Sequence, residues 1–526
     1  MSSLQGFAAL LPALLLLSPL VARVGAELRV ADFDEMEAYN SGQLGSKPNL
    51  TYYSSPLVSP SFLIDRWNEA GMTNATHILI SPSVAGQPRS PMVFSAKDLS
   101  LVYADPVRGG SNPQLQTFNG KEYFTFWTGT DMKGWGTGGG VILDESFDII
   151  YNLTTQGLDT GADNHEFQLT HDGGALLNNY HTTPFDVTAV GGPPDGLIQD
   201  CAFQEVDIAT GEVRFTWRAT DHFDLTETFG DQYEDRENGW DWFHMNSQFK
   251  TKDGNYLISS RHLRTIALLD GTTGERIWQL GGQRNSFLDL SDGRATNFAY
   301  QHHARFVDDS YTEVTFYDNH AMHPSSPTPG CEVDCSRGMR VRLDFDAMTA
   351  ELVHELYHPV GVQAWAQGGY QSLPEGGALI SWGTVPALTE FSADGEVVMD
   401  LQLGPWFGAQ EGEVNTYRVY KTNWVAQPRW RPEIAVVGSV VYVSWNGATE
   451  VASWSLSGGD DPLELEPLGS PVPKTGFETA IIPPKYAGYY RVAALNSDGN
   501  IMDSTLVIEV ATGAKLAGKR LPKIKT

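Results

Sequence analysis

The sequence predicts an all-β protein in which a β-propeller precedes a small β-sandwich. Two observations favour strands: helical periodicity is almost absent, and short runs of β-branched and aromatic residues alternate with turns rich in Gly, Asp and Asn. A third observation is a recurring unit of four strands, which is typical of propeller blades. With 526 residues, the chain is long enough to form more than one domain.

The repeat is clearest in the middle of the chain. Each unit there begins with an inner strand, which is followed by a turn that contains Gly and then by the outer strands. The four clearest units begin at His165, His244, His302 and Gly369. Earlier strands fit two more units, at about 76–105 and 115–152, and a strand at 417–420 could close the ring with N-terminal segments. We count six blades, and the uneven loop lengths also allow seven.

The composition changes after about residue 435. Several short strands within about 80 residues predict a small β-sandwich of immunoglobulin or fibronectin type, although it lacks the cysteine pair of immunoglobulin domains. We therefore expect four parts: a signal peptide (1–26), an N-terminal segment (27–75), the propeller (76–430) and the sandwich (435–515).

The first 26 residues predict a cleaved secretory signal. The apolar run from Leu10 to Leu17 is too short to span a bilayer, and the small residues Val24-Gly25-Ala26 fit a cleavage site. The alternatives are a membrane anchor or a buried helix. Three N-glycosylation sequons agree with secretion, and they begin at Asn49, Asn74 and Asn152. We expect a secreted, extracellular glycoprotein.

The chain is strongly acidic, with 35 Lys and Arg against 64 Asp and Glu and a net charge of −29. Such a surface repels nucleic acid and anionic lipid, so we expect neither as a partner. Any anionic substrate must be held by local positive groups.

The three cysteines suit an oxidising compartment. Cys331 and Cys335 could close a small disulfide loop, which leaves Cys201 unpaired and buried. A metal site is the alternative for this spacing, but no second cysteine pair lies nearby to complete four ligands.

The repeat predicts a cluster of histidines near the axis. The inner strands of propeller blades surround the axis, and His165, His244 and His302 occupy the same position in three consecutive units. Imidazole can act as nucleophile, base or metal ligand, and an Arg fork such as that of Arg261 fits sulfate or phosphate oxygens. This set suits an anionic tetrahedral group.

The same region resembles a known enzyme family. Asp241-Trp-Phe-His244-Met-Asn246-Ser, followed by Ser259-Ser-Arg261-His262, resembles the core motif of the PAPS-independent arylsulfate sulfotransferases. Asn164-His165 and Tyr300-Gln301-His302 with Tyr317-Asp-Asn319 resemble other motifs of that family. The resemblance covers about residues 90–430 and looks closest to the fungal secreted branch.

The resemblance implies a six-bladed propeller and a ping-pong sulfuryl transfer between phenols without a cofactor. His302 would take the sulfuryl group as a sulfohistidine, and one histidine would deprotonate the acceptor phenol. The residues that would bind sulfate oxygens and stabilise charge are His165, His244, Asn246 and Arg261. The expected substrate contacts are Asn319, His262 and Trp242, with Trp242 stacking on an aryl ring.

Two further patterns bear on this assignment. His303 follows His302, and adjacent strand residues face opposite ways, so we expect only His302 to face the axis. A nucleophilic imidazole must be unprotonated, which predicts activity at neutral or higher pH.

His354-Glu355-Leu-Tyr-His358 matches the zinc-protease pattern HExxH, but it lies in a predicted strand, where the two rings are too far apart to share a zinc ion.

Three other functions remain open. The protein could be a secreted binding propeller without catalysis, a metal protein that uses the three histidines, or an enzyme acting on an aromatic secondary metabolite.

Overall fold

The fold is described by a computed structural model that covers residues 28–84, 89–132, 134–321, 328–329, 331–406 and 414–516. The described residues form many strands and a single α-helix, α1 (Phe33–Asn40), so the predicted all-β class is confirmed. A capping box starts α1, because Asp32 accepts the backbone N–H of Glu35 and Glu35 accepts that of Asp32. In the described part of the chain, no helix has the length and apolar character needed to cross a membrane. The predicted signal peptide lies outside the described residues.

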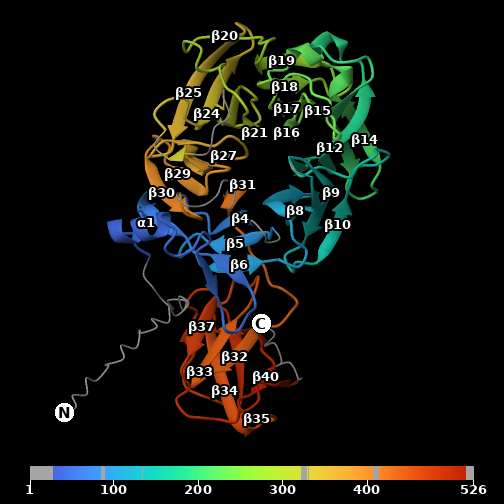
Figure 1. The fold of residues 1–526 in the computed structure, drawn as a ribbon. Helices are drawn as coiled ribbons and strands as arrows, with labels where there is room; N and C mark the ends of the chain where they lie inside the picture. Colours follow the sequence, from blue (N-terminus) through green and yellow to red (C-terminus); the bar gives the residue numbers. More distant parts are fainter. Residues whose placement is uncertain are drawn as a thin grey trace, which may run out of the picture.

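Six sheets surround a common centre in the described residues (Figure 1). Each contains four antiparallel strands in meander order, and some add a fifth strand at the edge. The sheets are numbered here by their order along the chain, and the strands of each sheet are given from the inner strand outward. The first sheet contains β31 (Val414–Thr422), β4 (His77–Val84), β5 (Met92–Ser95) and β6 (Leu101–Ala104). The second contains β7 (Ser111–Phe118), β8 (Lys121–Asp131), β9 (Gly136–Leu143) and β10 (Ile149–Leu153).

The third and fourth sheets carry two of the predicted histidine units. The third contains β11 (Phe167–Leu169), β12 (Gly174–Phe185), β13 (Gly196–Asp207) and β14 (Val213–Arg218), and β15 (Trp240–Asp241) pairs with β13 in parallel. The fourth contains β16 (Met245–Lys250), β17 (Tyr256–Ser260), β18 (Thr265–Leu269) and β19 (Arg276–Gly281).

The fifth and sixth sheets follow in the same order. The fifth contains β21 (His302–Phe306), β22 (Glu313–Asp318), β24 (Arg337–Asp344) and β25 (Thr349–Tyr357), with the short β20 (Leu288–Asp289) parallel to β25. The sixth contains β27 (Gly369–Ser372), β28 (Ala378–Ser381), β29 (Ala387–Phe391), β30 (Val397–Gln402) and β3 (Leu63–Trp67). Two short pairs lie outside these sheets: β1 (Asn49–Thr51) with β2 (Val58–Pro60), and β23 (Thr328–Pro329) with β26 (Val362–Gln363).

Chain segments far apart in sequence are paired at two places in the ring. β31 supplies the inner strand of the first sheet by pairing with β4, as the sequence suggested for residues 417–420. β3 pairs with β30 at the outer edge of the sixth sheet. The predicted N-terminal segment 27–75 is therefore not separate from the ring, because it contributes β3.

Hydrophobic clusters join each sheet to the next. Trp217 and Phe203 of the third sheet share a buried cluster with Ile258 of the fourth. Five more clusters join the remaining consecutive pairs, including the sixth sheet to the first. Burial of apolar faces between neighbouring sheets therefore stabilises the whole ring.

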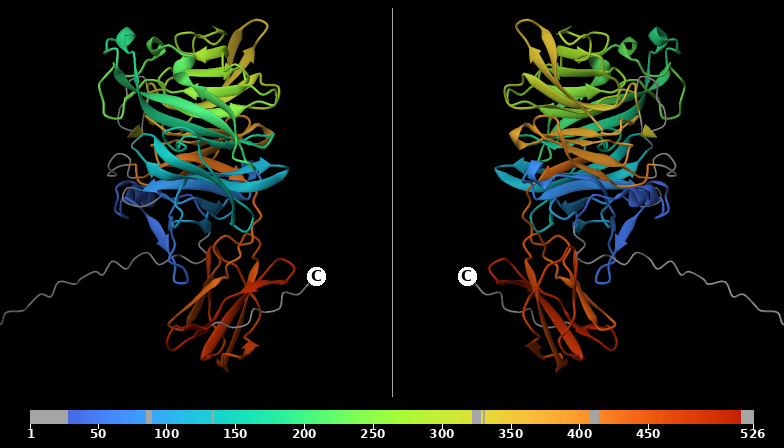
Figure 2. Two further views of the ribbon diagram at one scale, coloured as in Figure 1. Left: turned by 90° about the vertical axis from the view of Figure 1, so that its right-hand side faces the viewer. Right: turned by 90° about the vertical axis from the view of Figure 1, so that its left-hand side faces the viewer.

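The segment after the ring forms two further sheets that share one core (Figure 2). One contains β32 (Glu433–Val437), β33 (Val440–Ser444) and β37 (Glu478–Ile481). The other contains β34 (Ser453–Asp461), β35 (Glu464–Pro467), β36 (Val472–Pro473), β38 (Tyr489–Leu495), β39 (Ile501–Ser504), β40 (Val507–Glu509) and β41 (Lys515–Leu516). The side chain of Asn446 bonds both the backbone N–H and the carbonyl of Ala104 at 3.0 Å, which joins this part to β6.

Several sequence features fall where their chemistry requires. Cys331 and Cys335 form a disulfide, and Cys201 is a buried free cysteine. The sequon residues Asn49, Asn74 and Asn152 are all exposed. The HExxH pattern lies largely on β25, as the sequence predicted, and not on a helix.

Candidate functional site

Three histidines from different sheets meet in one cavity. His165 lies two residues before β11, His244 directly precedes β16 and His302 opens β21. All three are at most 6% exposed. They line a cavity of about 440 Å³, together with Arg89, Asp131, Gly134, Asn164, Arg261, Trp365, Ala366, Gln367 and Tyr417. The repeat position in the sequence therefore corresponds to one place in the fold.

The rings lie within contact distance of one another. The ring centres of His165 and His244 are 4.8 Å apart, in an edge-to-face arrangement. Tyr417, from the inner strand β31, lies between histidines, with its ring centre 5.9 Å from that of His165 and 6.2 Å from that of His302. A small group bound among these rings would be within reach of several side chains.

The protonated nitrogen of His302 can be inferred from its partners. The backbone N–H of Gln367 points at Nε2 over 3.3 Å, and an amide N–H can only donate. Nε2 must therefore carry the lone pair. Nδ1 is the protonated nitrogen, and it donates to Oδ1 of Asn319 over 2.7 Å. The neutral ring thus presents an unprotonated nitrogen at the cavity, held by a bond to Gln367 that is long and weak.

His165 and His244 are held differently, each by a carboxylate. Nδ1 of His165 lies 2.6 Å from Oδ1 of Asp163, whose other oxygen accepts the backbone N–H of Gly136. Nδ1 of His244 lies 2.5 Å from Oδ2 of Asp241. A carboxylate fixes the ring orientation and stabilises an imidazolium, whereas the amide oxygen at His302 supplies orientation without a negative charge.

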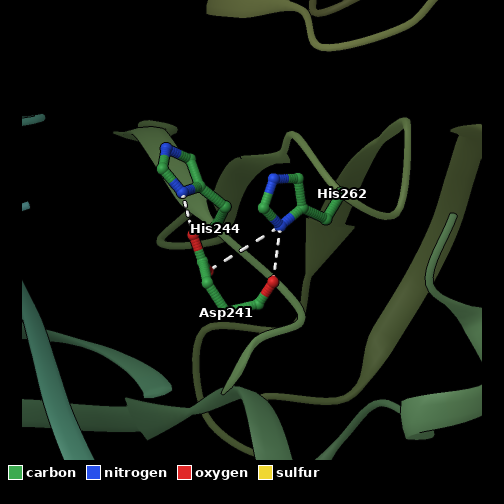
Figure 3. Close-up of side chains that lie close together, drawn as sticks. All are labelled: Asp241, His244 and His262. Carbon is green, nitrogen blue, oxygen red and sulfur yellow. Dashed lines mark hydrogen bonds and ion pairs between the residues drawn. The ribbon is translucent and has the colours of Figure 1, made fainter. Parts of the chain in front are cut away.

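Asp241 serves two histidines at once (Figure 3). Its side chain accepts from His244, and its backbone carbonyl accepts from Nδ1 of His262 over 2.7 Å. Among the described residues, Asp241, His244 and His262 are a group whose metal-ligating atoms all lie within 4.8 Å of one another. Direct hydrogen bonds between the members account for this close approach.

Burial sets the protonation state of the histidines. It is the main cause that lowers the pKa of His302 well below 6.5, and the charge of Arg261 lowers it further. The pKa of His244 is also well below 6.5, because of burial, His165 and Arg261. Burial lowers the pKa of His262 to about 3. Burial therefore favours the neutral form of His302, which is the form that a nucleophile needs.

Two arginines line the cavity, and Arg89 forms an ion pair with Asp131, whereas Arg261 lies near aromatic rings. Its guanidinium lies 4.4 Å from the ring centre of Tyr300 and 6.0 Å from that of Trp365, so two aromatic side chains hold it. Its Nε has no hydrogen-bond partner, and Nη2 makes only a 3.4 Å contact to the carbonyl of Trp365. Most of its N–H donors are thus available to a bound anion.

Backbone distortions place the catalytic candidates. The pairing of β16 with β17 shifts register between Met245 and Ser247, and that of β21 with β22 shifts between His302 and Arg305. His244 and His303 have positive φ angles of 54° and 57°. Such bulges re-aim side chains, and left-handed backbone at non-glycine residues is unfavourable, so surrounding contacts must maintain it.

A buried ion cluster ties the histidine strands together. Glu166, which follows His165, accepts two bonds of 3.0 Å from Arg418 and one of 2.6 Å from Arg305. Arg418 also donates to the carbonyl of Asn246 over 2.8 Å. Glu166 and Arg418 are at most 1% exposed. This cluster joins residues from the first, third, fourth and fifth sheets.

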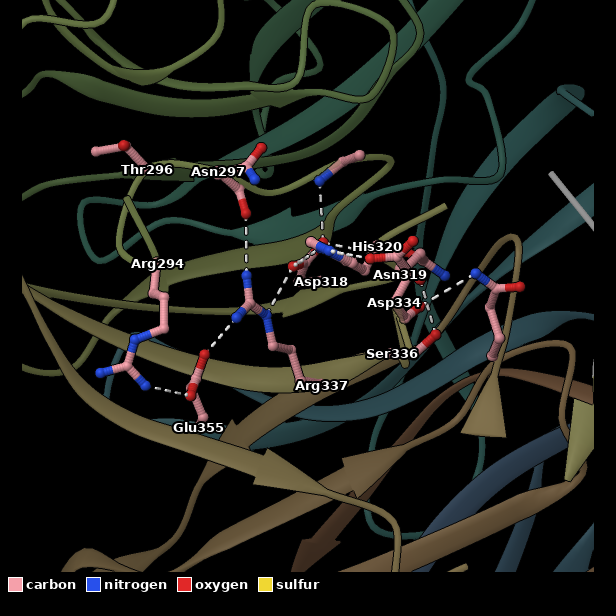
Figure 4. Close-up of polar contacts among 12 residues, drawn as sticks. Arg294, Thr296, Asn297, Asp318, Asn319, His320, Asp334, Ser336, Arg337 and Glu355 are labelled. Atoms are coloured by element: carbon pink, nitrogen blue, oxygen red, sulfur yellow. Dashed lines mark hydrogen bonds and ion pairs between the residues drawn. The ribbon is translucent and has the colours of Figure 1, made fainter. Parts of the chain in front are cut away.

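Asn319 is supported by a second polar network (Figure 4). Its side-chain amide donates to the carbonyls of Ala364 and Gln367, and Ser336 donates to its backbone carbonyl. The preceding residue, Asp318, is fully buried and accepts from Arg337 over 2.9 Å. Arg337 also pairs with Glu355, so the acceptor of the His302 ring is held on several sides.

Not every residue chosen from the sequence lines the cavity. Trp242 is 0% exposed and lies in the core between the third and fourth sheets, so it is not positioned to stack on a substrate there. Asn246 is also fully buried, and its amide donates to the carbonyl of Gln301. Asn319 contacts Nδ1 of His302, and His262 contacts the backbone carbonyl of Asp241. Neither Asn319 nor His262 is among the residues that line the cavity. His303 contacts Tyr420 instead of the cavity, as the alternation of strand residues predicted.

The structure adds residues that the sequence did not single out. Asp163 and Asp241 stand two and three residues before their histidines, and this local spacing was a usable signal. Trp365, Gln367 and Tyr417 come from a loop and from the ring-closing strand, where the repeat gives no indication.

Comparison with known proteins gives one family match. The family model described as arylsulfotransferase (ASST) matches residues 114–404, which is more than half of the chain. A search of the curated proteins finds no match.

Solved structures show only a distant likeness. A protein of unknown function from Bacteroides caccae is 13% identical, covers 66% of this chain and 98% of its own, and has a TM-score of 0.37. A protein from Lactobacillus plantarum is 12% identical over 77% of this chain and 99% of its own, with a TM-score of 0.34. The Cps50 (Swd1) β-propeller domain from Myceliophteria thermophila is 10% identical over 76% and 96%, also with a TM-score of 0.34.

Proposed function

Because the chain belongs to the arylsulfotransferase (ASST) family, we propose that it transfers a sulfuryl group from an aryl sulfate to a phenol through a sulfohistidine at His302. The observation that carries this proposal is the difference between the three histidines. His302 is held by an amide, whereas His165 and His244 are held by carboxylates. A nucleophile needs a free lone pair, and groups that carry a proton benefit from a nearby anion.

In the first half-reaction, Nε2 of His302 attacks the sulfur atom and the bond between sulfur and the aryl oxygen breaks. The aryl oxygen leaves with the electron pair of that bond. Charge on the equatorial sulfuryl oxygens is stabilised by the N–H donors of Arg261, and His165 lines the same cavity. The positive charge of Arg261 also offsets the negative field of the whole protein.

In the second half-reaction, Nε2 of His244 takes the proton of the acceptor phenol. The phenol oxygen attacks the sulfur atom, and the electrons of the N–S bond return to Nε2 of His302. Asp241 stabilises the imidazolium that His244 becomes, and the proton then passes to solvent. Nε2 of His244 has no hydrogen-bond partner in the described structure, which suits an acceptor of a substrate proton.

Trp365 is the aromatic side chain best placed to hold the aryl ring. It lines the cavity and remains 38% exposed, whereas Trp240 and Trp242 are at most 2% exposed. Aromatic stacking beyond simple area burial contributes about 0.5–1.5 kcal/mol. A cavity of about 440 Å³ accommodates a small aromatic molecule.

The experiment measures sulfuryl transfer from 4-nitrophenyl sulfate to a phenol, and the release of 4-nitrophenol is the signal. Wild type should be active, His302→Asn should lose activity, and His171→Asn should retain it. His171 is an exposed histidine on a turn and is the matched control. Equal activity of wild type and His302→Asn would contradict the proposed mechanism.

The fold and location form a second proposal. The six sheets would be the blades of a six-bladed propeller, which is supported by the hydrophobic clusters between all consecutive sheets. The C-terminal sheets would form an immunoglobulin-like or fibronectin-like sandwich. The disulfide and the three exposed sequon asparagines support a secreted glycoprotein. Membership of the fungal secreted branch is proposed from the motif resemblance alone.

A further inference from the structure

A cavity of about 650 Å³ lies at the outer edge of the sixth sheet, away from the histidine centre. Its walls come from α1, β3, β30 and the chain that follows β25. The side chains that matter for its chemistry are Met36, Asp65, His358, Asp400, Gln402 and Trp406. None of them lines the histidine cavity or enters the proposed sulfuryl transfer.

The strand pairing is distorted where Asp65 meets this cavity. In the pairing of β3 with β30, Ile64 is opposite Leu401 and Arg66 is opposite Asp400, so the register shifts at Asp65. An extra residue in one strand re-aims side chains and is frequent next to functional sites. The distortion brings a second carboxyl group to the cavity that Asp400 already lines.

Asp65, Asp400 and Glu396 bring three carboxyl groups to the cavity wall, and Arg66 brings one guanidinium. Asp65 and Asp400 are the two carboxyl groups that affect each other. Asp400 is 3% exposed, accepts the hydroxyl of Thr389 over 2.7 Å and lies 3.3 Å from Nε2 of His358. Burial, together with the charge of Asp400, raises the pKa of Asp65 to about 6. Two like charges held close together in a partly buried place are relieved by a proton or by a bound cation.

Two acceptor oxygens of the lining residues have no hydrogen-bond partner in the described structure. They are Oδ2 of Asp65 and Oε1 of Gln402, although the side chains of Asp65 and Gln402 are hydrogen-bonded to each other through their other atoms. Gln402 is only 3% exposed. Unpartnered buried polar atoms are rare and costly, so such atoms in a cavity wall indicate a missing donor.

The size and spacing of the cavity distinguish between two kinds of cation. Among the described residues, the three-residue group with ligand atoms within 4.8 Å of one another is Asp241, His244 and His262, and not Asp65, His358 and Asp400. A cavity of about 650 Å³ is also far larger than a bare metal ion and fits a small organic molecule. Trp406 and Met36 offer apolar surface, and an indole face attracts organic cations.

We propose that this cavity binds an organic cation through a primary or secondary ammonium group. The N–H donors would be received by Asp65 and Gln402, the charge would be balanced by Asp65 and Asp400, and the carbon skeleton would pack on Trp406 and Met36. This site is independent of the sulfuryl transfer proposed above.

The test is isothermal titration calorimetry on the full secreted chain. The probes are the amines 2-phenylethylamine, tyramine and 1,4-diaminobutane, with 2-phenylethanol as the neutral counterpart of the first. Asp65→Asn removes one charge with little change of shape, and Trp406→Leu removes the indole. Asp394→Asn is the matched control, because it removes a charge from an exposed turn near the cavity without lining it.

At least one amine should bind at a single saturable site, and the alcohol should not. Asp65→Asn and Trp406→Leu should each weaken binding at least tenfold, while Asp394→Asn and His302→Asn should bind as wild type does. Retained sulfuryl transfer in the two cavity variants would show that they are folded. If transfer fails in every protein, thermal unfolding supplies that control instead.

Several results would overturn the proposal. They are no saturable binding by any of the three amines, equal binding of the alcohol, or undiminished binding by Asp65→Asn and Trp406→Leu. Loss of amine binding in His302→Asn would assign the amine to the histidine cavity. Binding of magnesium or zinc chloride that Asp65→Asn abolishes, without amine binding, would identify a metal site instead.

Discussion

Replacement of Asp241 by Asn tests whether His244 acts as the base while His302 acts as the nucleophile. The change removes the negative charge 2.5 Å from Nδ1 of His244, but it keeps the backbone carbonyl that receives the hydrogen bond of His262. The lost charge acts most strongly on His244, because the carboxylate lies farther from Nδ1 of His262, at 3.8 Å. Asp231→Asn is the matched control, because Asp231 is an exposed acid in the preceding loop.

The magnitude follows from the charge that is lost. An opposite charge at hydrogen-bond distance stabilises the protonated form of a group by about 1–3 pKa units. One unit corresponds to about 1.4 kcal/mol, so the imidazolium of His244 loses about 1.4–4 kcal/mol. Proton transfer from the acceptor phenol should slow about 10-fold to 1,000-fold. If the new amide donates to Nδ1 and moves the ring proton to Nε2, the loss will be larger.

The assay separates the two half-reactions. Rapid mixing with 4-nitrophenyl sulfate should still give a burst of 4-nitrophenol in Asp241→Asn, because 4-nitrophenolate leaves without help from an acid. Transfer to the acceptor should be slow, and it should be slowest with weakly acidic phenols, which depend most on a base. Loss of the burst with normal acceptor transfer would refute the role assigned to His244.

Three further outcomes are expected. Trp365→Ala should raise KM for aryl sulfates, with a loss of about 0.5–1.5 kcal/mol in binding and little change in kcat; an unchanged KM would remove Trp365 from the substrate contacts. His262 has a folded pKa of about 3, so the unfolded chain binds its proton more readily and stability falls as the pH drops below about 6.5. The loss is about 1.6 kcal/mol between pH 6.5 and 5, and urea unfolding of His262→Asn should show a shallower pH dependence than wild type. Glu166→Gln leaves Arg418 buried without a counter-charge and should destabilise the fold by about 3–5 kcal/mol in the same assay; a change below about 1 kcal/mol would show that the ion cluster is dispensable.

The sequence predicted the cluster of three histidines, because the same repeated unit sets both their spacing in the sequence and their positions in the fold. Each inner strand begins at an equivalent place in its sheet, so His165, His244 and His302 converge although 58 and 79 residues separate neighbouring members. The acids that hold two of these rings are sequence neighbours of the histidines. The coordinates were needed to show that His165 and His244 bond carboxylates, whereas His302 bonds an amide.

Other parts of the site depend on contacts that no local pattern contains. Trp240 lies on β15, which pairs with β13, and Trp242 follows it into the core instead of the cavity. Asn246 lies at a register shift, where alternation along the strand no longer gives the direction of a side chain. Trp365 and Tyr417 reach the cavity from segments outside the histidine repeat.

The pairing of the N-terminal region was not visible in the sequence for a similar reason. The hydrogen-bonding partner of β3, β30, lies more than 300 residues later in the chain. Pairing at such a separation depends on how the six sheets are arranged, which short-range sequence patterns do not encode.

The central claim is that His302 forms the covalent intermediate at Nε2. The most direct measurement is peptide mass spectrometry after brief exposure to an aryl sulfate without acceptor, under alkaline conditions that preserve a sulfohistidine. The account predicts one SO3 group on the peptide that contains His302, lost when a phenol is added. An adduct on His165 or His244 instead, or transfer with no protein adduct at all, would contradict it.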